Sequence, residues 1–371
     1  MSVMIRNWFS KTNVPTILIV LLILCAILYR LEFLQESGKD FRTYEKAVQT
    51  FLSGRNPYIN TVQSFTTDDS GSHGYAYLPG ILTLYSALYL FTLTLGWSAA
   101  VLWKIPVLLA DLLIGVYIYR QLKSKTVIGA LFGASTWYFN SYLITEGKYT
   151  HTEPLSILFL FLALYYLNRD KVISYTSLGL SIIFKTLPVI LLPYVFLKGS
   201  KKNKKLLITI CILLGAVFSI PFLTSSVDFI TMLKGSLFVH SRREIQGRPF
   251  LFYLSYYYGI ELFQIIPLWV YSILSIFGGV VISLVFLILK RGSVYLVTTL
   301  AFLNFYLFTP VFNRTYLLWA LPFYIIATFE VFRNKKLAYA FIVFYWLFFY
   351  WYLDQWVDGF HITKPDRLIN F

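Results

Sequence analysis

The sequence predicts an all-α protein that crosses a membrane many times. Of its 371 residues, 58% are hydrophobic, 19% are aromatic and only 13% are charged, whereas a soluble domain carries about 25% charged residues. Apolar stretches of about 20 residues recur from end to end, and each is long enough to cross a bilayer as a helix. Strands that alternate apolar and polar residues, which a membrane β-barrel would need, are absent from the sequence.

The basic residues indicate how these helices are oriented. A net charge of +15 could suggest a nucleic-acid partner, but Lys and Arg are clustered at the ends of apolar stretches, at 120–125, 169–171, 198–205, 290–291 and 333–336. Basic clusters concentrate on the inner side of a membrane. We therefore exclude nucleic acid as a partner and place all five clusters inside.

The first apolar stretch, at about 14–33, is expected to be a spanning helix that leads outward. It follows Arg6 and Lys11, it is too long for the core of a signal peptide, and it lacks a small-residue cleavage site. Cys25 and Cys211 both lie inside apolar stretches. Neither a disulfide framework nor a cysteine metal site is therefore expected.

The charge rule then assigns the remaining elements in order. After an outer loop at 34–98, helices are expected at about 99–119, 127–143 and 154–168, with a short outer loop at 144–153. The stretch 78–95 is long enough to span, but a crossing there would place the 120–125 cluster outside. We therefore expect a helix that lies along the outer membrane face inside the first loop.

The second half of the chain contains an expected break. The stretch 172–197 begins and ends at basic clusters, so we expect two half-helices with a turn at "FKTLP", a geometry that requires a protein-lined cavity. A helix at about 206–224 leads to an outer loop at 225–262, two hairpins follow, and the tail at 354–371 lies outside. The whole chain is then a single domain, 1–371, with about eleven spans.

With this topology, the polar residues that are unusual in such an apolar chain gather on the outer face. They are Asp40, Arg42, His73, Glu146, His151, Glu153, His240, Arg242, Arg243, Glu244, Asn313 and Arg314. Such a convergence is what an active site at a membrane surface would need.

A series of motifs follows the first helix. Asp40 is followed by "YEKAVQTFLSG", "RNPY", "YAYLPGILTLY" and "ADLLIGVYIYRQL". This order resembles the GT-C superfamily of membrane glycosyltransferases, which use polyprenyl-phosphate-linked sugars. The nearest branch contains the GPI first mannosyltransferase and the bacterial and archaeal polyprenyl-phosphate-mannose enzymes.

Three later motifs extend the resemblance to Leu321. They are "FKTLPVILLPY", "VHSRREIQGRPFLFY" and "VFNRTYLLWALPF". The chain departs from the GPI branch at one position, because that branch carries a paired Asp-x-Asp where this sequence reads "GKDF", with Gly38 and Asp40.

The resemblance implies that Asp40 is the catalytic base. Inverting glycosyl transfer needs a carboxylate to take the proton from the acceptor hydroxyl while the sugar–phosphate bond breaks on the opposite face. The sequence has no Gly-rich phosphate loop, and a polyprenyl phosphate, already a good leaving group, needs none. The alternative is that Asp40 is the N-cap of the helix "FRTYEKAVQTFL".

Five cations are candidates for holding the donor phosphate, since a planar guanidinium suits phosphate oxygens and an intramembrane lysine is costly unless it meets an anion. They are Lys185, His240, Arg242, Arg243 and Arg248. Arg242 and Arg243 could instead contact lipid headgroups or pair with Glu244, and Lys185 could merely snorkel.

The remaining candidates are expected to contact the acceptor or the sugar. They are Arg42, Tyr44, Tyr75, Tyr77, Glu146, His151, Glu153, Asn313 and Arg314. Glu146, His151 and Glu153 are also candidates for a divalent cation, Mg or Mn, although no dedicated spacing marks them. Glu153, just before Pro154, could simply begin a helix.

Together these observations predict a glycosyltransferase that moves one sugar, with mannose expected, from a polyprenyl-phosphate (dolichol-type) carrier to a lipid or glycan acceptor. Its partners would be the donor, the acceptor and membrane lipids. The reaction would occur on the outer or lumenal face of a plasma membrane or endoplasmic reticulum membrane. A transporter or lipid flippase is the alternative, although such proteins usually bind their cargo at the membrane midplane. A non-catalytic lipid-binding subunit is a third possibility.

Overall fold

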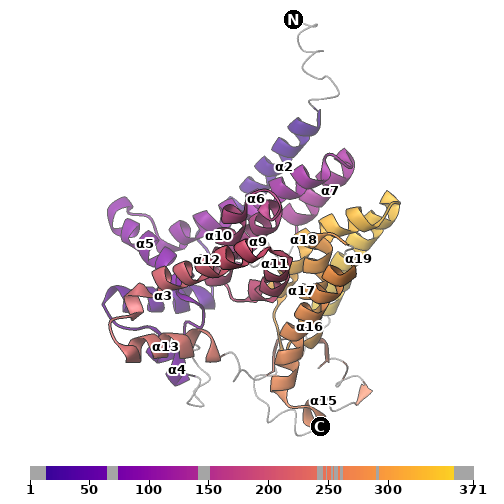
Figure 1. Cartoon of the computed structure of the whole chain (residues 1–371). Coiled ribbons are helices and arrows are strands. Elements are labelled where there is room, and N and C mark those ends of the chain that lie inside the picture. The colour runs from indigo at the N-terminus through magenta and orange to yellow at the C-terminus, as the bar shows by residue number, and fades with distance from the viewer. Residues whose placement is uncertain are drawn as a thin grey trace, which may run out of the picture.

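The protein is an all-α polytopic membrane protein (Figure 1). The computed structural model describes residues 14–64, 74–140, 151–239, 245–247, 249–251, 254, 258–259, 262–289 and 292–354. The first half comprises α2 (Val14–Leu31), α3 (Lys39–Leu52), α4 (Tyr58–Ser64), α5 (Pro79–Leu95), α6 (Ala99–Leu122), α7 (Val127–Tyr138), α9 (Glu153–Tyr166) and α10 (Lys171–Phe184).

The second half is also helical, apart from two very short strands. Its elements are η1 (Leu187–Leu191), α11 (Leu192–Lys198), α12 (Lys201–Ser219), η2 (Ile220–Phe222), α13 (Ser226–Ser236), β1 (Gln246–Gly247), α15 (Leu262–Ile265), α16 (Leu268–Leu289), α17 (Val294–Phe308), β2 (Val311–Phe312), η4 (Arg314–Tyr316), α18 (Leu317–Val331) and α19 (Lys335–Asp354).

Within the described ranges, four helices are long and apolar enough to cross a membrane by length and composition. They are α2, α6, α16 and the continuous stretch Lys201–Phe222, formed by α12 and η2. Seven shorter apolar helical segments accompany them, in α5, α7, α9, α10, η1–α11, α17 and α18. The predicted fold class is therefore confirmed, and the number of eleven spans stays a prediction.

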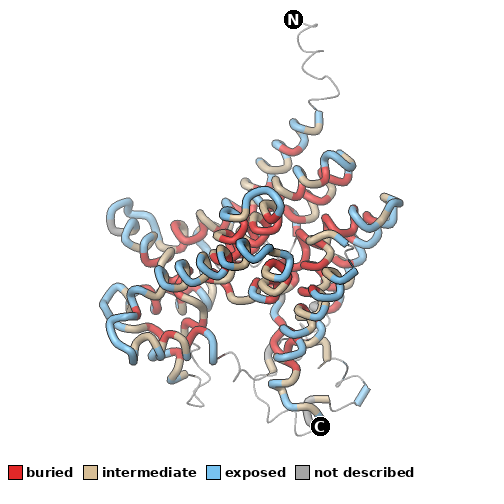
Figure 2. Tube along the Cα trace, viewed as in Figure 1, coloured by how far each residue is buried: buried red, intermediate tan, exposed pale blue. Residues whose placement is uncertain are grey.

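The core is centred on α9 and α18. Almost every residue of α9 from Glu153 to Leu164 is buried, and so is nearly all of α18 from Leu317 to Phe329. A helix that is apolar all round belongs in the interior of a bundle. In contrast, Leu207 is the single buried residue of α12, and Figure 2 shows the exposed face that α12 and α16 present. This apolar, exposed surface suits contact with lipid.

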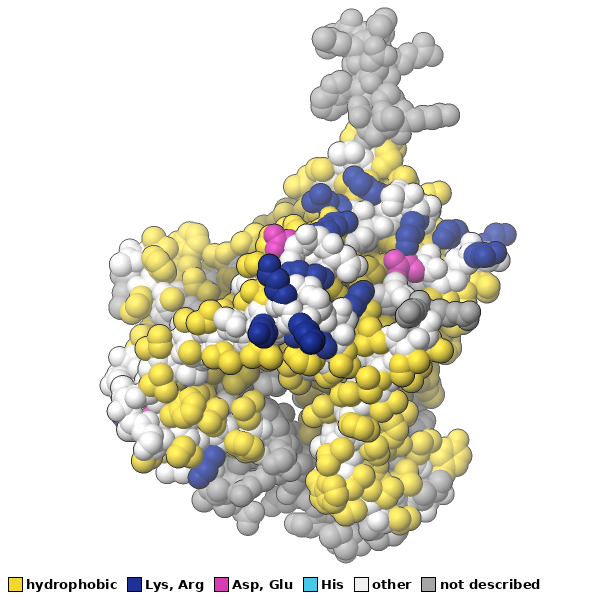
Figure 3. All heavy atoms as spheres, viewed as in Figure 1, with side chains coloured by type: hydrophobic (Ala, Val, Ile, Leu, Met, Phe, Trp, Pro, Cys, Tyr) yellow, Lys and Arg dark blue, Asp and Glu magenta, His cyan; other side chains and the backbone are white. Residues whose placement is uncertain are grey.

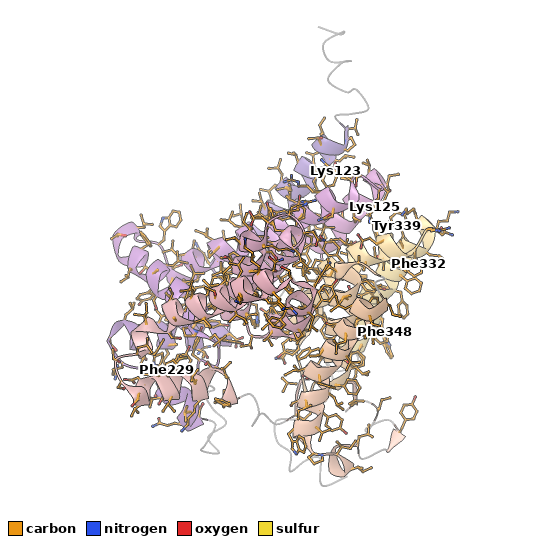
Figure 4. The ribbon with its side chains drawn as sticks, in the orientation of Figure 1. Lys123, Lys125, Phe229, Phe332, Tyr339 and Phe348 are labelled. Carbon is orange, nitrogen blue, oxygen red and sulfur yellow. The ribbon has the colours of Figure 1, made fainter. Side chains whose placement is uncertain are left out.

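Two of the basic clusters lie at the same end of the molecule. Lys125 Nζ is 2.9 Å from Glu330 Oε1, which joins the turn after α6 to the end of α18. Figure 4 shows Lys123 and Lys125 at the same end as Phe332 and Tyr339. Figure 3 shows most Lys and Arg side chains of this face in its upper and central parts, with apolar side chains below. This arrangement agrees with the charge pattern from which the orientation was predicted.

The stretch 172–197 is interrupted where the sequence predicts a turn. α10 ends at Phe184, Lys185 has an extended backbone, and η1 and α11 follow. Gly80 in α5 packs against the end of α10, because a Cβ at Gly80 would lie 2.5 Å from Cγ2 of Ile183. The absence of a side chain at this glycine therefore lets α5 approach the interruption closely.

A short parallel pairing joins two predicted outer segments. Gln246 pairs with Val311 and Gly247 with Phe312. Phe250 stacks on Tyr352 of α19, with ring centroids 4.4 Å apart. Gln246, Gly247 and Phe250 thus lie beside Val311 and Phe312, although the two segments are distant in sequence.

Candidate active site

Asp40 lies in the first turn of α3 but does not cap it. The N-cap is Gly38, and no side chain makes a capping hydrogen bond there. The prediction of Asp40 as an N-cap is therefore wrong, because α3 begins one residue before it. The Asp40 side chain is 50% exposed, so the carboxylate is accessible to a reactant, and the helix dipole favours its charge.

The second loop brings His151 and Glu153 to Asp40. His151 Nδ1 lies 3.9 Å from Asp40 Oδ2 and 3.7 Å from Glu153 Oε2. Glu153 is the first residue of α9, as one reading of the sequence predicted, and only 1% of it is exposed. Its Oε1 accepts a hydrogen bond from Lys185, whereas its Oε2 has no hydrogen-bond partner. The site thus contains a row of three ionisable side chains that runs from the surface to the interior.

Lys185 continues this row into the core. Its ammonium forms a buried ion pair with Glu153 and lies 5.0 Å from the centroid of the Tyr77 ring. The Lys185 side chain is only 10% exposed, so the alternative that it snorkels to the surface is wrong. The burial of the Lys185 charge is compensated by the Glu153 carboxylate. A donor phosphate would therefore have to share Lys185 with this carboxylate.

Tyrosines form one wall of the site. Tyr44 stacks on Tyr77, with ring centroids 6.0 Å apart, and contacts Tyr75 at 5.9 Å and Tyr85 at 5.6 Å. Burial, reinforced by Tyr77 and the Asp40 carboxylate, raises the pKa of Tyr44 well above its usual value. Its hydroxyl therefore stays protonated and can donate a hydrogen bond.

Backbone hydrogen bonds hold the "YAYLPG" segment of this wall in place. The Tyr75 hydroxyl donates to Leu78 O and accepts from Leu82 N, at 2.9 and 3.0 Å. The Tyr58 hydroxyl donates to Tyr77 O at 2.8 Å. The rings are consequently fixed before any substrate binds, which favours a preorganised site.

In the late motif, the Tyr316 carbonyl accepts a hydrogen bond from the Tyr306 hydroxyl. Asn313 is exposed, and its carbonyl accepts a hydrogen bond from Tyr316 N. Arg42 is also exposed, on α3 two residues after Asp40. The described residues thus unite Asp40, Tyr44, Tyr77, His151, Glu153 and Lys185, but they do not bring Arg42 into contact with this cluster.

Several predicted site residues lie outside the described residues. They are Glu146, His240, Arg242, Arg243 and Arg248, the side chain of Arg314, and the outer-face residues His73 and Glu244.

The described part of the chain does not fit a divalent cation. It contains no group of three or more His, Cys, Asp or Glu side chains arranged to hold a metal ion. Asp40, His151 and Glu153 come near one another, but Lys185 already neutralises Glu153. Because Glu146 lies outside the described residues, binding of Mg or Mn by Glu146, His151 and Glu153 stays a prediction.

No family model matches the chain. The chain is similar to the GPI mannosyltransferase 1 of Kluyveromyces lactis, with 30% identity over 235 residues, 60% of this chain and 54% of the relative. It spans about half the length of the curated relative that it matches.

The "ADLL" motif contains a charged residue whose partner could not be identified from the sequence. Asp111 of the "ADLL" motif forms a buried ion pair with Arg30 of α2 and accepts a hydrogen bond from Trp137 Nε1 at 2.8 Å. The signal was present in the sequence, because ionisable residues inside apolar stretches are costly and usually have a partner.

Lys104, seven residues before Asp111 on α6, was also missed. It is 3% exposed, and its ammonium donates to the backbone carbonyls of Phe33 and Glu36. These carbonyls lie at the exit of α2, just before α3 begins. α6 therefore binds α2 through Asp111 and Arg30, and binds the segment before α3 through Lys104. These two contacts position Asp40 relative to the rest of the site.

Proposed function

We propose that this chain transfers a mannosyl group from a polyprenyl-phosphate carrier to a glycolipid acceptor at the outer or lumenal membrane face. The observation that carries the proposal is the place of Asp40, a half-exposed carboxylate beside a buried and preorganised polar cluster. The relationship to a protein named GPI mannosyltransferase 1 supports the sugar and the class of acceptor.

In this reaction the Asp40 carboxylate takes the proton from the acceptor hydroxyl. The hydroxyl oxygen forms a bond to C1 of the mannosyl group while the bond from C1 to the phosphate oxygen breaks on the opposite face. The electron pair of that bond leaves with the polyprenyl phosphate. His151, 3.9 Å from Asp40, is close enough to orient the carboxylate as it gains the proton.

The basic side chains of the site would stabilise the leaving phosphate. Lys185 supplies a buried cation, and charge-assisted hydrogen bonds to phosphate are strong. His240, Arg242, Arg243 and Arg248, which lie outside the described residues, stay candidates for the same role. A donor phosphate that binds Lys185 would weaken the ion pair between Lys185 and Glu153. Donor binding would therefore be coupled to the breaking of this ion pair.

The test uses purified protein in lipid, radiolabelled polyprenyl-phosphate-mannose and an extract of glycolipid acceptors. Asp40→Asn is expected to lower the transfer rate by about 10²–10⁴-fold, the usual contribution of a general base. Glu45→Gln on the same helix is the matched control and should keep wild-type activity. Full activity of Asp40→Asn would remove Asp40 from the mechanism.

The interruption of the helix at Lys185 favours a second candidate, transport of a lipid-linked sugar, because transporters bind cargo at broken helices. Cysteines introduced beside Lys185 would then react with labels from both sides of the membrane in alternation. Transfer of label to a glycolipid by the wild-type protein decides for the enzyme.

A further inference from the structure

Two buried polar atoms at the site have no hydrogen-bond partner. They are Oε2 of Glu153 and the hydroxyl of Tyr85, in residues that are 1% and 0% exposed. The large majority of buried polar side-chain atoms are paired, and each exception calls for a physical explanation. Across the described residues four such atoms occur, so two of the four belong to this one region.

Contacts between neighbouring side chains connect the two residues. The Tyr85 ring meets the Tyr44 ring edge-on at 5.6 Å, and Tyr44 stacks on Tyr77. The Lys185 ammonium lies 5.0 Å from the centroid of the Tyr77 ring and forms an ion pair with Glu153. Burial raises the pKa of Tyr44 and of Tyr85, and the Glu153 charge adds a smaller contribution in the same direction.

The chemistry of the two atoms is complementary. An ionised carboxylate oxygen only accepts hydrogen bonds, whereas a phenol can donate one. A hydroxyl group both donates and accepts, so hydroxyls can satisfy Glu153 Oε2 and Tyr85 together. A sugar ring presents several hydroxyls on a small frame, and its C–H faces suit the flanking rings of Tyr44 and Tyr77.

The hydroxyls of two neighbouring tyrosines, Tyr75 and Tyr58, are already hydrogen-bonded. The Tyr75 hydroxyl is occupied by Leu78 O and Leu82 N, and the Tyr58 hydroxyl by Tyr77 O. Tyr85 is the last residue of the motif "YAYLPGILTLY", but it was not among the predicted site residues, because the sequence does not show that its hydroxyl is unpaired.

We infer that Tyr85 and Glu153 form a sugar-recognition point that hydrogen-bonds ring hydroxyls of the pyranose that reacts beside Asp40. This inference rests on the proposed mannosyl transfer. The pyranose can be the mannosyl group of the donor or the terminal sugar of the acceptor, and the same chemistry serves both.

Tyr85→Phe tests the inference with little structural disturbance. The phenylalanine ring keeps the stacking that Tyr85 makes on Trp103, with centroids 4.6 Å apart and planes 3° apart. Removal of an unpaired buried hydroxyl is expected to leave the melting temperature unchanged or raised. Tyr89→Phe, one turn later on α5 and also against Trp103, is the matched control.

The assay compares kcat/KM of wild type and Tyr85→Phe with polyprenyl-phosphate-mannose and with its 2-, 3-, 4- and 6-deoxy analogues. The loss with the intact donor is expected to be about tenfold or more, since a site built to bind a hydroxyl discriminates strongly when the bond is absent. With one deoxy analogue the two proteins should become equal, because the partner hydroxyl is already gone. If Tyr85→Phe has a lower kcat/KM than wild type with every deoxy donor, and its KM for the acceptor is raised, the recognition point binds the acceptor sugar.

Three results would overturn the inference. Tyr85→Phe could keep wild-type kcat/KM for both substrates, it could lose as much as Tyr89→Phe loses, or it could lose activity in step with a fallen melting temperature. The proposed function is judged separately by the wild-type protein. Transfer by wild type with no effect of Tyr85→Phe refutes only the recognition point, whereas no transfer by wild type refutes both.

Discussion

Removal of the Asp111 charge should destabilise the protein strongly. Arg30 and Asp111 are 6% and 3% exposed, and Arg30 also donates to Ala26 O at 3.1 Å and Tyr138 O at 2.9 Å. In Asp111→Asn these carbonyl bonds remain, but the guanidinium charge loses its anion. Breaking a buried pair from one side costs about 3–5 kcal/mol.

This magnitude should be visible in thermal unfolding. At roughly 2 °C per kcal/mol, a loss of about 3–5 kcal/mol lowers the melting temperature by roughly 6–10 °C. The measurement is the thermal unfolding of purified protein in lipid, followed by intrinsic fluorescence. Asp170→Asn is the matched control, because Asp170 is the exposed N-cap of α10 and Asn caps a helix as well as Asp does.

A double variant separates charge from packing. Arg30→Met with Asp111→Leu replaces both partners by apolar side chains, a change that is often neutral or stabilising for buried pairs. The double variant should therefore melt well above Asp111→Asn. A shift below about 1 °C for Asp111→Asn, or a double variant as unstable as the single one, would refute the assignment of a stabilising charge pair.

Two further predictions concern the segments around the site. Lys104→Met should lower kcat of transfer more than it changes KM, because it releases the segment that leads to the catalytic carboxylate, and Lys104→Arg should restore part of the rate. Hydrogen bonds from Asn56, Ser225 and Thr224 lower the pKa of Asp228. The stability that this carboxylate contributes is present above its unfolded pKa and is lost as the pH falls through its folded pKa. Asp228→Asn should therefore flatten the acid limb of a plot of melting temperature against pH; an unchanged limb would contradict this.

Much of the architecture follows from local patterns in the sequence. The predicted spanning helices are helical where the structure describes them. The interruption at Lys185 was predicted because the basic clusters at 169–171 and 198–205 are separated by too few residues for two full crossings of the membrane. The convergence of Asp40, His151 and Glu153 follows from orientation, since the charge rule placed both outer loops on one side.

The pairings could not be predicted in the same way. Lys185 and Glu153 are 32 residues apart on different helices, and the sequence showed two costly charges without showing that each was the other's partner. The prediction that Asp40 caps α3 failed for a different reason, because the helix begins two residues earlier than predicted and helix ends are uncertain by one or two residues. Tyr85 was not predicted because its importance lies in an unpaired hydroxyl, a property of packing that no local pattern records.

The distance between Arg30 and Asp111 along the chain, 81 residues, has a consequence for biosynthesis. At about 5–20 residues per second, a ribosome needs roughly 4–16 s to deliver the partner after Arg30 has been made. During that interval α2 lies in the bilayer with a cation in its last turn and no anion, and the long side chain reaches toward the headgroups. We expect α2 to be a provisional span until α6 arrives, so that the segment bearing Asp40 takes its working position only when that later helix inserts.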